Sequence, residues 1–273
     1  MRFIRTYIWA FLNTISLLSM LWVNYMANAI PIAGKTTGQL SAEYPNMFVP
    51  AGITFAIWGL IYATLIGFVL YQWYTIWKGR GEGSKAVLDI GPWFLMSCGL
   101  NIGWIFAWHY EMLSISVLTM IALLITLAII FVKVNNDRDR RSRKELIAVA
   151  FPFSLYFSWI TVALVANITA LLVGNGFDGG GFSEAYWASA LIFVAALISM
   201  AITYSYGDLA FAGVTLWALM GIIIKQSQSI GDGSGFIVLS AWISVGLVAA
   251  IMAIVAYKKR IYWRARKIQP NLA

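Results

Sequence analysis

The sequence has little of what a metal or redox centre needs. It contains a single cysteine, Cys98, and a single histidine, His109. One cysteine excludes an intrachain disulfide and a cysteine metal cluster, and a lone histidine excludes a histidine metal site. We expect Cys98 to be a small buried packing residue, and His109 and Glu111 to face water in a turn. No cofactor is therefore expected to be obligatory.

Charge is scarce as well. Charged residues make up 11% of the chain, apolar residues 61%, and the mean hydropathy is +0.78. These values lie outside the usual range of soluble domains and indicate a polytopic membrane protein. No charged residue lies in the middle of an apolar segment, so ion-driven transport is weakly supported. Without clustered carboxylates or a second histidine, the sequence offers no catalytic constellation.

Eight apolar segments are long enough to cross a bilayer. The fold class that we expect is therefore an all-α integral membrane protein with eight transmembrane helices. A cleaved signal after Ala29 is a competing interpretation of the first segment, but that segment is longer than the usual signal peptide core and contains Trp and Asn residues. The eight segments cover residues 4–29, 50–77, 91–110, 113–132, 146–173, 184–205, 209–226 and 236–257.

The positions of the basic residues predict the topology. Seventeen of the nineteen lie before the first span, in the second and fourth loops and in the tail, whereas Lys35 and Lys225 lie on the other side. By the positive-inside rule, both termini are cytoplasmic, and we expect a multi-pass protein of a bacterial-type plasma membrane. The net charge of +8 is thus a topology signal, so nucleic acid is not an expected partner. The basic tail, residues 258–273, can also hold anionic lipid.

Aromatic residues are abundant, and one stretch places them deep in a span. Phe55, Trp58 and Tyr62 recur at i, i+3 and i+7 after Pro50, which puts three rings on one helix face. Ordinary helix packing explains such a stripe. However, Trp58 and Tyr62 lie below the headgroup belt, and buried Trp and Tyr usually find polar partners, so a protein-lined interior is the alternative.

Two other spans combine asparagine with tryptophan on a single face. Asn101, Trp104 and Trp108 are spaced i, i+3 and i+7, and Trp159, Ala163 and Asn167 are spaced i, i+4 and i+8. An asparagine alone is most often a clamp between helices. The predicted topology places one layer of residues between the midplane and the outer surface, namely Trp58, Tyr62, Asn101, Trp104, Trp159, Ala163 and Asn167. The first loop, residues 30–49, leads into Pro50 and can close that layer from outside.

These motifs together resemble the TspO family, the tryptophan-rich sensory proteins related to the mitochondrial translocator protein. The likeness lies in Pro50, Trp58 and Tyr62, in Asn101 with Trp104, and in the run Tyr156, Trp159 and Asn167, and it covers the first five spans. It implies a five-helix bundle with a pocket beneath the first loop that binds tetrapyrroles and, in some members, sterols or synthetic aromatic ligands. The ligand-binding residues would be Trp58, Tyr62, Asn101, Trp104, Trp108, Tyr156, Trp159, Ala163 and Asn167.

On this interpretation the chain is an enlarged member of that family. Residues 1–175 form the ligand-binding unit, residues 176–257 a three-helix membrane extension, and residues 258–273 a basic cytoplasmic tail. The function that we favour is a membrane receptor or sensor that binds a flat hydrophobic ligand, a porphyrin or haem. A transporter of porphyrins or other lipophilic molecules is the alternative, and a tetrapyrrole-degrading enzyme is the least favoured. Expected partners are that small molecule, membrane lipids and a second copy of the chain in a homodimer.

Overall fold

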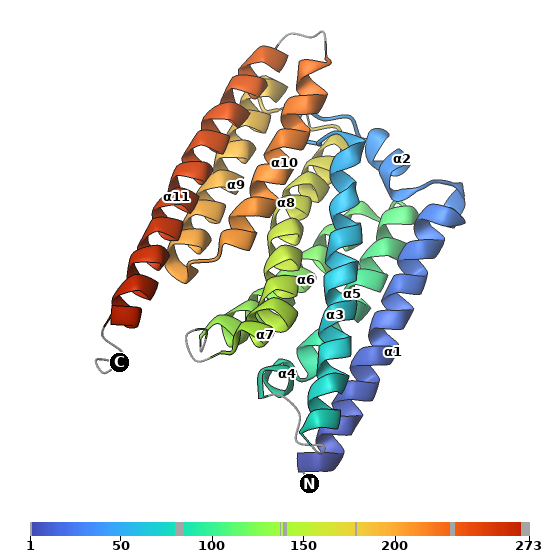
Figure 1. Cartoon of the computed structure of the whole chain (residues 1–273). Helices are drawn as coiled ribbons and strands as arrows, with labels where there is room; N and C mark the ends of the chain where they lie inside the picture. The colour runs from blue at the N-terminus through green and yellow to red at the C-terminus, as the bar shows by residue number, and fades with distance from the viewer. Residues whose placement is uncertain are drawn as a thin grey trace.

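A computed structural model (Figure 1) describes residues 2–79, 85–136, 138, 141–177, 179–229 and 233–268, and the regular elements within these ranges are all helical. In chain order they are α1 (Arg2–Ala29), η1 (Ile32–Gly34), α2 (Thr37–Ala42), η2 (Gly52–Ala56), α3 (Ile57–Lys78), α4 (Lys85–Ile90), α5 (Pro92–His109), α6 (Leu113–Asn135), α7 (Arg143–Glu145), η4 (Leu146–Ala150), α8 (Phe151–Gly174), α9 (Glu184–Tyr206), α10 (Leu209–Ser227) and α11 (Ser234–Ile268).

Seven of the described helical segments are long and apolar enough to cross a membrane, and they contain α1, α3, α6, α8, α9, α10 and α11. The chain is therefore a multi-pass integral membrane protein. The predicted eighth span is α5, which is not among these seven. It has 18 residues and contains Asn101, His109 and three tryptophans. Figure 1 shows that α1 begins and α11 ends at the same end of the bundle. Such an arrangement needs an even number of crossings, which supports α5 as the eighth span.

The helices form two groups with different neighbours. α1, α3, α5, α6 and α8 pack together and are called the five-helix unit below, and α9, α10 and α11 form the three-helix unit. α10 packs against α8, and Phe211 of α10 contacts Phe131 and Phe157 with ring centroids 6.4 and 5.4 Å apart. One continuous apolar core includes residues of both units. The predicted division at residue 175 thus coincides with the end of α8, and it remains a prediction for folding and function.

A buried carboxylate joins the two units at the end of the bundle where α1 begins. Asp208 precedes α10 and is 1% exposed. One of its oxygens accepts hydrogen bonds from Arg138, 3.0 Å away, and from Ser154 Oγ, 2.6 Å away. The other caps α10 by accepting from two backbone N–H groups. A charge at this depth is tolerated because it is paired and hydrogen-bonded.

The opposite end of the bundle carries the first loop, in which α2 lies (Figure 1). Thr36 and Gln39 form a capping box that starts α2. The loop then leads into η2, so the second span begins as a 3-10 turn and becomes α-helical at Ile57. The basic tail, which is predicted to bind anionic lipid, begins at residue 258, and the structure describes its side chains only as far as Arg260, so lipid binding remains a prediction.

Candidate functional site

Four aromatic rings form a stack in the interior of the five-helix unit. The Trp58 ring lies between Tyr62, with centroids 5.4 Å apart, and Trp104, with centroids 6.4 Å apart, and both pairs are nearly parallel. Trp104 stacks in turn on Trp108 at 6.3 Å. Offset stacking at these separations is favourable. The helical spacing that predicted rings on single faces of two spans is thus matched by direct contact between α3 and α5.

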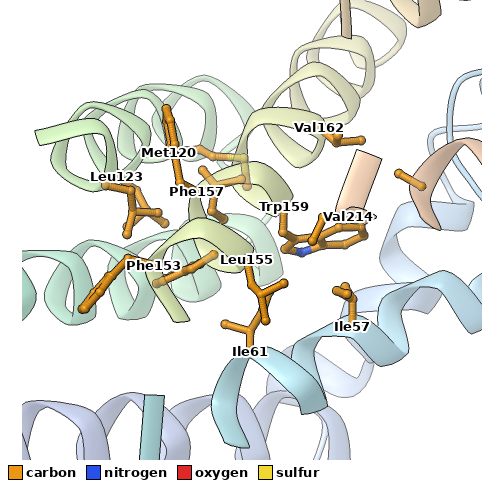
Figure 2. Close-up of a cluster of buried hydrophobic side chains, with 14 of the residues drawn as sticks. Ile57, Ile61, Met120, Leu123, Phe153, Leu155, Phe157, Trp159, Val162 and Val214 are labelled. Carbon is orange, nitrogen blue, oxygen red and sulfur yellow. The ribbon is translucent and has the colours of Figure 1, made fainter. Parts of the chain in front are cut away.

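Two further rings meet this stack edge-on. Trp159 of α8 contacts Trp58 at 6.2 Å and Phe55 at 6.0 Å, in each case with nearly perpendicular planes. Figure 2 shows Trp159 projecting from α8, with Ile57 of α3 and Val214 of α10 beside its ring. Tyr156 contacts Trp58 at 5.9 Å. Rings of α3, α5 and α8 therefore contact one another.

A small apolar pocket of about 50 Å³ lies against the stack. Pro50, Phe55, Thr37 and Ser41 close it on the side of the first loop, as predicted for that loop. A volume of 50 Å³ holds about one or two water molecules. Six of the predicted site residues line this pocket, namely Trp58, Trp104, Trp108, Trp159, Ala163 and Asn167.

A larger and more polar pocket of about 350 Å³ lies beside it, toward α1. Its lining includes Tyr62 and the side chains of Asn24, Asn28 and Thr36. Both pockets share Thr37, Phe55, Trp58 and Trp104. The Trp58–Trp104 contact is therefore part of the wall that separates an apolar compartment from a polar one.

Three buried polar groups in these linings have no hydrogen-bond partner among the described residues. They are Nε1 of Trp104, Nε1 of Trp159 and Oγ1 of Thr37. Buried donors are almost always paired in folded proteins, and an unpaired one costs about 1–3 kcal/mol. All three lie in the lining of the apolar pocket. Three residues that line this pocket thus carry polar groups, two indole N–H donors and one hydroxyl, that have no partner among the described residues.

Asn101 and Tyr156 lie outside the linings of both pockets, although both are predicted ligand-binding residues. Asn101 is fully buried, and its amide donates to Tyr156 Oη at 2.9 Å. Its carbonyl oxygen accepts from Asn24 Nδ2 at 2.7 Å, and Asn24 in turn accepts from Tyr62 Oη at 2.6 Å. This network joins four helices beneath the pockets. Asn101 therefore has the clamp geometry between helices that the sequence left open as the simpler alternative.

Asn167 differs from Asn101 because it both binds a neighbour and lines the apolar pocket. Its amide and the hydroxyl of Ser116 lie 2.8–3.1 Å apart and connect α8 to α6. One edge of Asn167 is thus held in place while the residue forms part of the pocket surface. A side chain fixed in this way can orient a ligand with little loss of conformational entropy.

Sequence reasoning did not identify Asn24, Asn28, Thr36 and Thr37 as pocket residues. Asn24 and Asn28 have the i, i+4 spacing of one helix face, and Asn28 donates to the Asn24 backbone carbonyl at 3.0 Å. That spacing within an apolar span was the signal available. The two threonines lie at the start of α2, and nothing in a loop sequence indicates which helices it covers.

An ionic cluster fastens the first loop to the α5–α6 turn. Lys35 Nζ lies 2.6 Å from Glu43 and 3.4 Å from Glu111, and Tyr44 Oη donates to Glu111 at 2.8 Å. The hydrogen bond from Tyr44, followed by that from Lys35, lowers the pKa of Glu111. Burial, followed by the bond to Glu111, raises the pKa of Tyr44 to about 12. The Tyr44 ring also lies 6.1 Å from Trp108, so this cluster holds the loop over the stack.

The expectation that His109 faces water is wrong. The residue is 3% exposed, and Nδ1 lies 2.9 Å from the backbone oxygen of Ile105. Since that oxygen accepts only, Nδ1 carries the proton in this arrangement. Glu111 and Tyr110 are exposed as expected for this turn. Within the described part of the chain, no group of three or more His, Cys, Asp or Glu residues could hold a metal ion.

Comparison with known proteins agrees with the resemblance found in the motifs. The family model described as TSPO-like protein matches residues 10–259, which includes the helices of both units. No curated protein and no solved structure matches the chain. The match extends beyond the five spans that carry the motifs and continues through α9, α10 and most of α11. The chain belongs to the TSPO-like protein family.

Proposed function

We propose that this protein is a membrane receptor or sensor that binds a flat hydrophobic ligand, of which a tetrapyrrole is our first candidate, at the aromatic stack of the five-helix unit. The observation that carries the proposal is the stack itself. Trp58 and Trp104 lie nearly parallel at 6.4 Å, and Trp104 and Trp159 each hold a buried N–H group that has no partner among the described residues. A planar ligand offers a π-face to such rings and, where it carries nitrogen or oxygen acceptors, partners to the free donors.

Binding at this place requires the rings to move. The apolar pocket of about 50 Å³ is too small for a tetrapyrrole, and the polar pocket of about 350 Å³ lies on the other side of the shared wall. Rotation of Trp58 and Trp104 would join the two spaces into one. The apolar face of a ligand would then meet Trp159 and Ala163, and its polar edge would meet Asn24 and Asn28. This division suits a macrocycle with polar substituents on one edge.

The Trp159→Phe variant tests the proposal. It keeps an apolar ring but removes the indole donor and part of the stacking area, so affinity should fall about fivefold, on the order of 1 kcal/mol, while the fold survives. The measurement is quenching of Trp fluorescence by protoporphyrin IX in both proteins, with thermal unfolding followed in parallel. Trp242→Phe is the matched control because Trp242 lies on α11 and is 49% exposed.

Two results would contradict the proposal. Unchanged affinity with lowered stability would assign Trp159 to packing. Saturable binding that both variants retain equally would place the porphyrin at another part of the protein. Identification by mass spectrometry of small molecules retained by the purified wild type would then show which class of ligand the stack accepts.

A further inference from the structure

The three-helix unit holds the segment that closes the apolar pocket. We define the rim segment as residues 46–56, which include η2 and end where α3 begins. Ala51 N–H donates to the backbone oxygen of Gly221 at 3.0 Å. Trp217 Nε1 donates to the oxygen of Thr54 at 2.9 Å, and Gln226 Nε2 donates to the oxygen of Met47 at 2.8 Å. Three residues of α10 therefore bind the backbone of the rim segment at three points.

A fourth hydrogen bond comes from α9. The Met47 N–H group donates to the carboxylate of Glu184 at 2.7 Å. Both backbone groups of Met47 are thus satisfied by the three-helix unit. These two bonds fix the backbone of the rim segment at Met47 to both α9 and α10.

The contact at Gly221 is too close for a side chain. A Cβ atom at this position would lie 2.9 Å from the Cβ of Pro50 and closer still to the Thr54 hydroxyl. Two residues of the rim segment thus occupy the place that any other residue at 221 would fill. By contrast, a Cβ atom at Gly213, eight residues earlier on α10, would meet nothing within 4 Å.

The same rim segment supplies the wall of the apolar pocket. Pro50 and Phe55 line the pocket, and Phe55 lies edge-on to Trp159 at 6.0 Å. Thr54 and Ala51, the residues bound by α10, are chain neighbours of these two. A change of a few tenths of an ångström at the α10 contacts must therefore be carried into the pocket wall, because the interior is close-packed.

We propose that α10 sets the position of the pocket rim, so that Trp217, Gly221 and Gln226 are positioning residues for ligand binding although none of them lines the pocket. The three-helix unit is then part of the binding apparatus. This inference rests on the proposed function for its ligand but not for its geometry. It assigns a role in binding to helices that lie outside the five spans carrying the family motifs.

The experiment uses the full chain and two matched pairs of variants. Trp217→Phe removes one rim hydrogen bond and keeps the ring, with Trp242→Phe as its control. Gly221→Ala adds one methyl group against the rim, with Gly213→Ala as its control on the same helix. Each is combined with Cys98→Ala and with Ala163→Cys, which places a reactive thiol in the pocket lining.

The first readout needs no ligand. We expect the rate of Ala163→Cys labelling by a small maleimide to rise at least threefold in Trp217→Phe and in Gly221→Ala, and to stay within experimental error in the two controls. Unchanged labelling in both rim variants would overturn the inference, because the rim would then hold its position without α10. The labelling test does not depend on a porphyrin. If the wild type fails to bind one, only the proposed function is overturned.

The second readout is the affinity for protoporphyrin IX, measured on the same variants with Cys98 and Ala163 restored. Trp217→Phe should weaken binding about threefold to tenfold, while the temperature of unfolding changes no more than in Trp242→Phe. A purely structural role predicts the opposite pattern, in which stability falls and affinity does not. If labelling rises and porphyrin binding is unchanged, α10 positions the rim without effect on the ligand, and the inference fails for binding.

Discussion

The five-helix unit and the three-helix unit fill their interiors with different side chains. In the first, tryptophan, tyrosine and asparagine surround two pockets. In the second, Ala196, Ala212 and Val248 form a separate small cluster between α9, α10 and α11. Small residues let helix backbones approach closely in a membrane, whereas stacked rings leave irregular spaces between them. The two interiors thus differ in packing, with rings and amides around the stack and small residues between α9, α10 and α11.

Both interiors hold paired and unpaired buried polar groups, and one of each kind can be compared. Asn101 of the five-helix unit has partners on both sides of its amide. In the three-helix unit, the hydroxyl groups of Ser199, Thr203 and Ser244 are buried and have no partner among the described residues. Their side chains are small enough to fit between close helices, so shape explains their presence there better than hydrogen bonding. Loss of a paired group such as Asn101 and loss of an unpaired one such as the Ser244 hydroxyl should therefore have different effects.

The largest expected effect is at the junction that joins the two units. In Asp208→Ala, the Arg138 guanidinium loses its partner 3.0 Å away, Ser154 loses its acceptor, and α10 loses its cap. Removing one member of a buried ion pair costs about 3–5 kcal/mol. We expect that loss in the free energy of unfolding, measured by denaturant titration in detergent micelles.

Asp208→Asn sharpens this measurement, because its single amide oxygen can still cap α10, while an NH2 group replaces the oxygen that accepts from Arg138 and Ser154. The free energy of unfolding should fall less in Asp208→Asn than in Asp208→Ala. A change below about 1 kcal/mol in Asp208→Ala would show that the carboxylate does not hold the units together. The porphyrin affinity of Asp208→Ala then reports whether the five-helix unit still binds when its junction with the three-helix unit is weakened.

The layer of aromatic residues was predictable because it depends only on spacing within single helices. The i, i+3 and i+7 positions of Phe55, Trp58 and Tyr62 predicted rings on one side of the second span, and Trp58 and Tyr62 do stack at 5.4 Å. The topology predicted from the basic residues then placed the polar and aromatic residues of three spans at the same depth. Neither step required knowledge of which helices are neighbours.

What the sequence left undetermined depends on contacts between distant segments. The partner of Asn101 is Asn24, 77 residues away on α1, and only the packing of α1 against α5 shows that the two amides meet. His109 was expected at the surface because it ends a helix, yet it is buried. The contact of α10 with the rim segment likewise has no local signal, because a glycine within an apolar helix has many uses.

An intermediate effect is expected when each interior loses one polar group. In Asn101→Leu, the amide of Asn24 and the hydroxyl of Tyr156 lose a partner, so the free energy of unfolding should fall by about 1–2 kcal/mol. In Ser244→Ala, an unpaired buried hydroxyl is removed, and stability should be unchanged or slightly higher. Thermal unfolding of both variants gives the comparison directly. Equal losses would show that the two interiors are not different in this respect.

The smallest expected effect concerns how the first loop and the rim segment are attached to the rest of the protein. The first loop is fastened to the five-helix unit by exposed ionisable groups, whereas the rim segment is fastened to α10 by neutral donors and acceptors. The attachment of the first loop should depend on pH through Glu111 and Tyr44, whereas the bonds from α10 to the rim segment should not. The carboxylate that binds the rim segment, Glu184, belongs to α9 and accepts from Met47 N–H. A spin label at Ala42→Cys on the exposed side of α2, in the Cys98→Ala background, reports the mobility of the loop by electron paramagnetic resonance.

The direction of the pH effect follows from the pKa shifts. Hydrogen bonds from Tyr44 and Lys35 lower the pKa of Glu111 below its ordinary value of 4.5, so its contribution is complete above that value and is lost as pH falls through the lowered pKa. The pKa of Tyr44 is raised from 10.0 to about 12, so its contribution is complete below pH 10 and is lost as pH rises through 12. The label should therefore be least mobile between about pH 5 and 10 and become more mobile on either side.

In Glu111→Gln, the step on the acid side should disappear and the loop should be more mobile at neutral pH. An acid step of the same size in Glu111→Gln would assign it to another group, and high salt should weaken the attachment in the wild type because these charges are exposed.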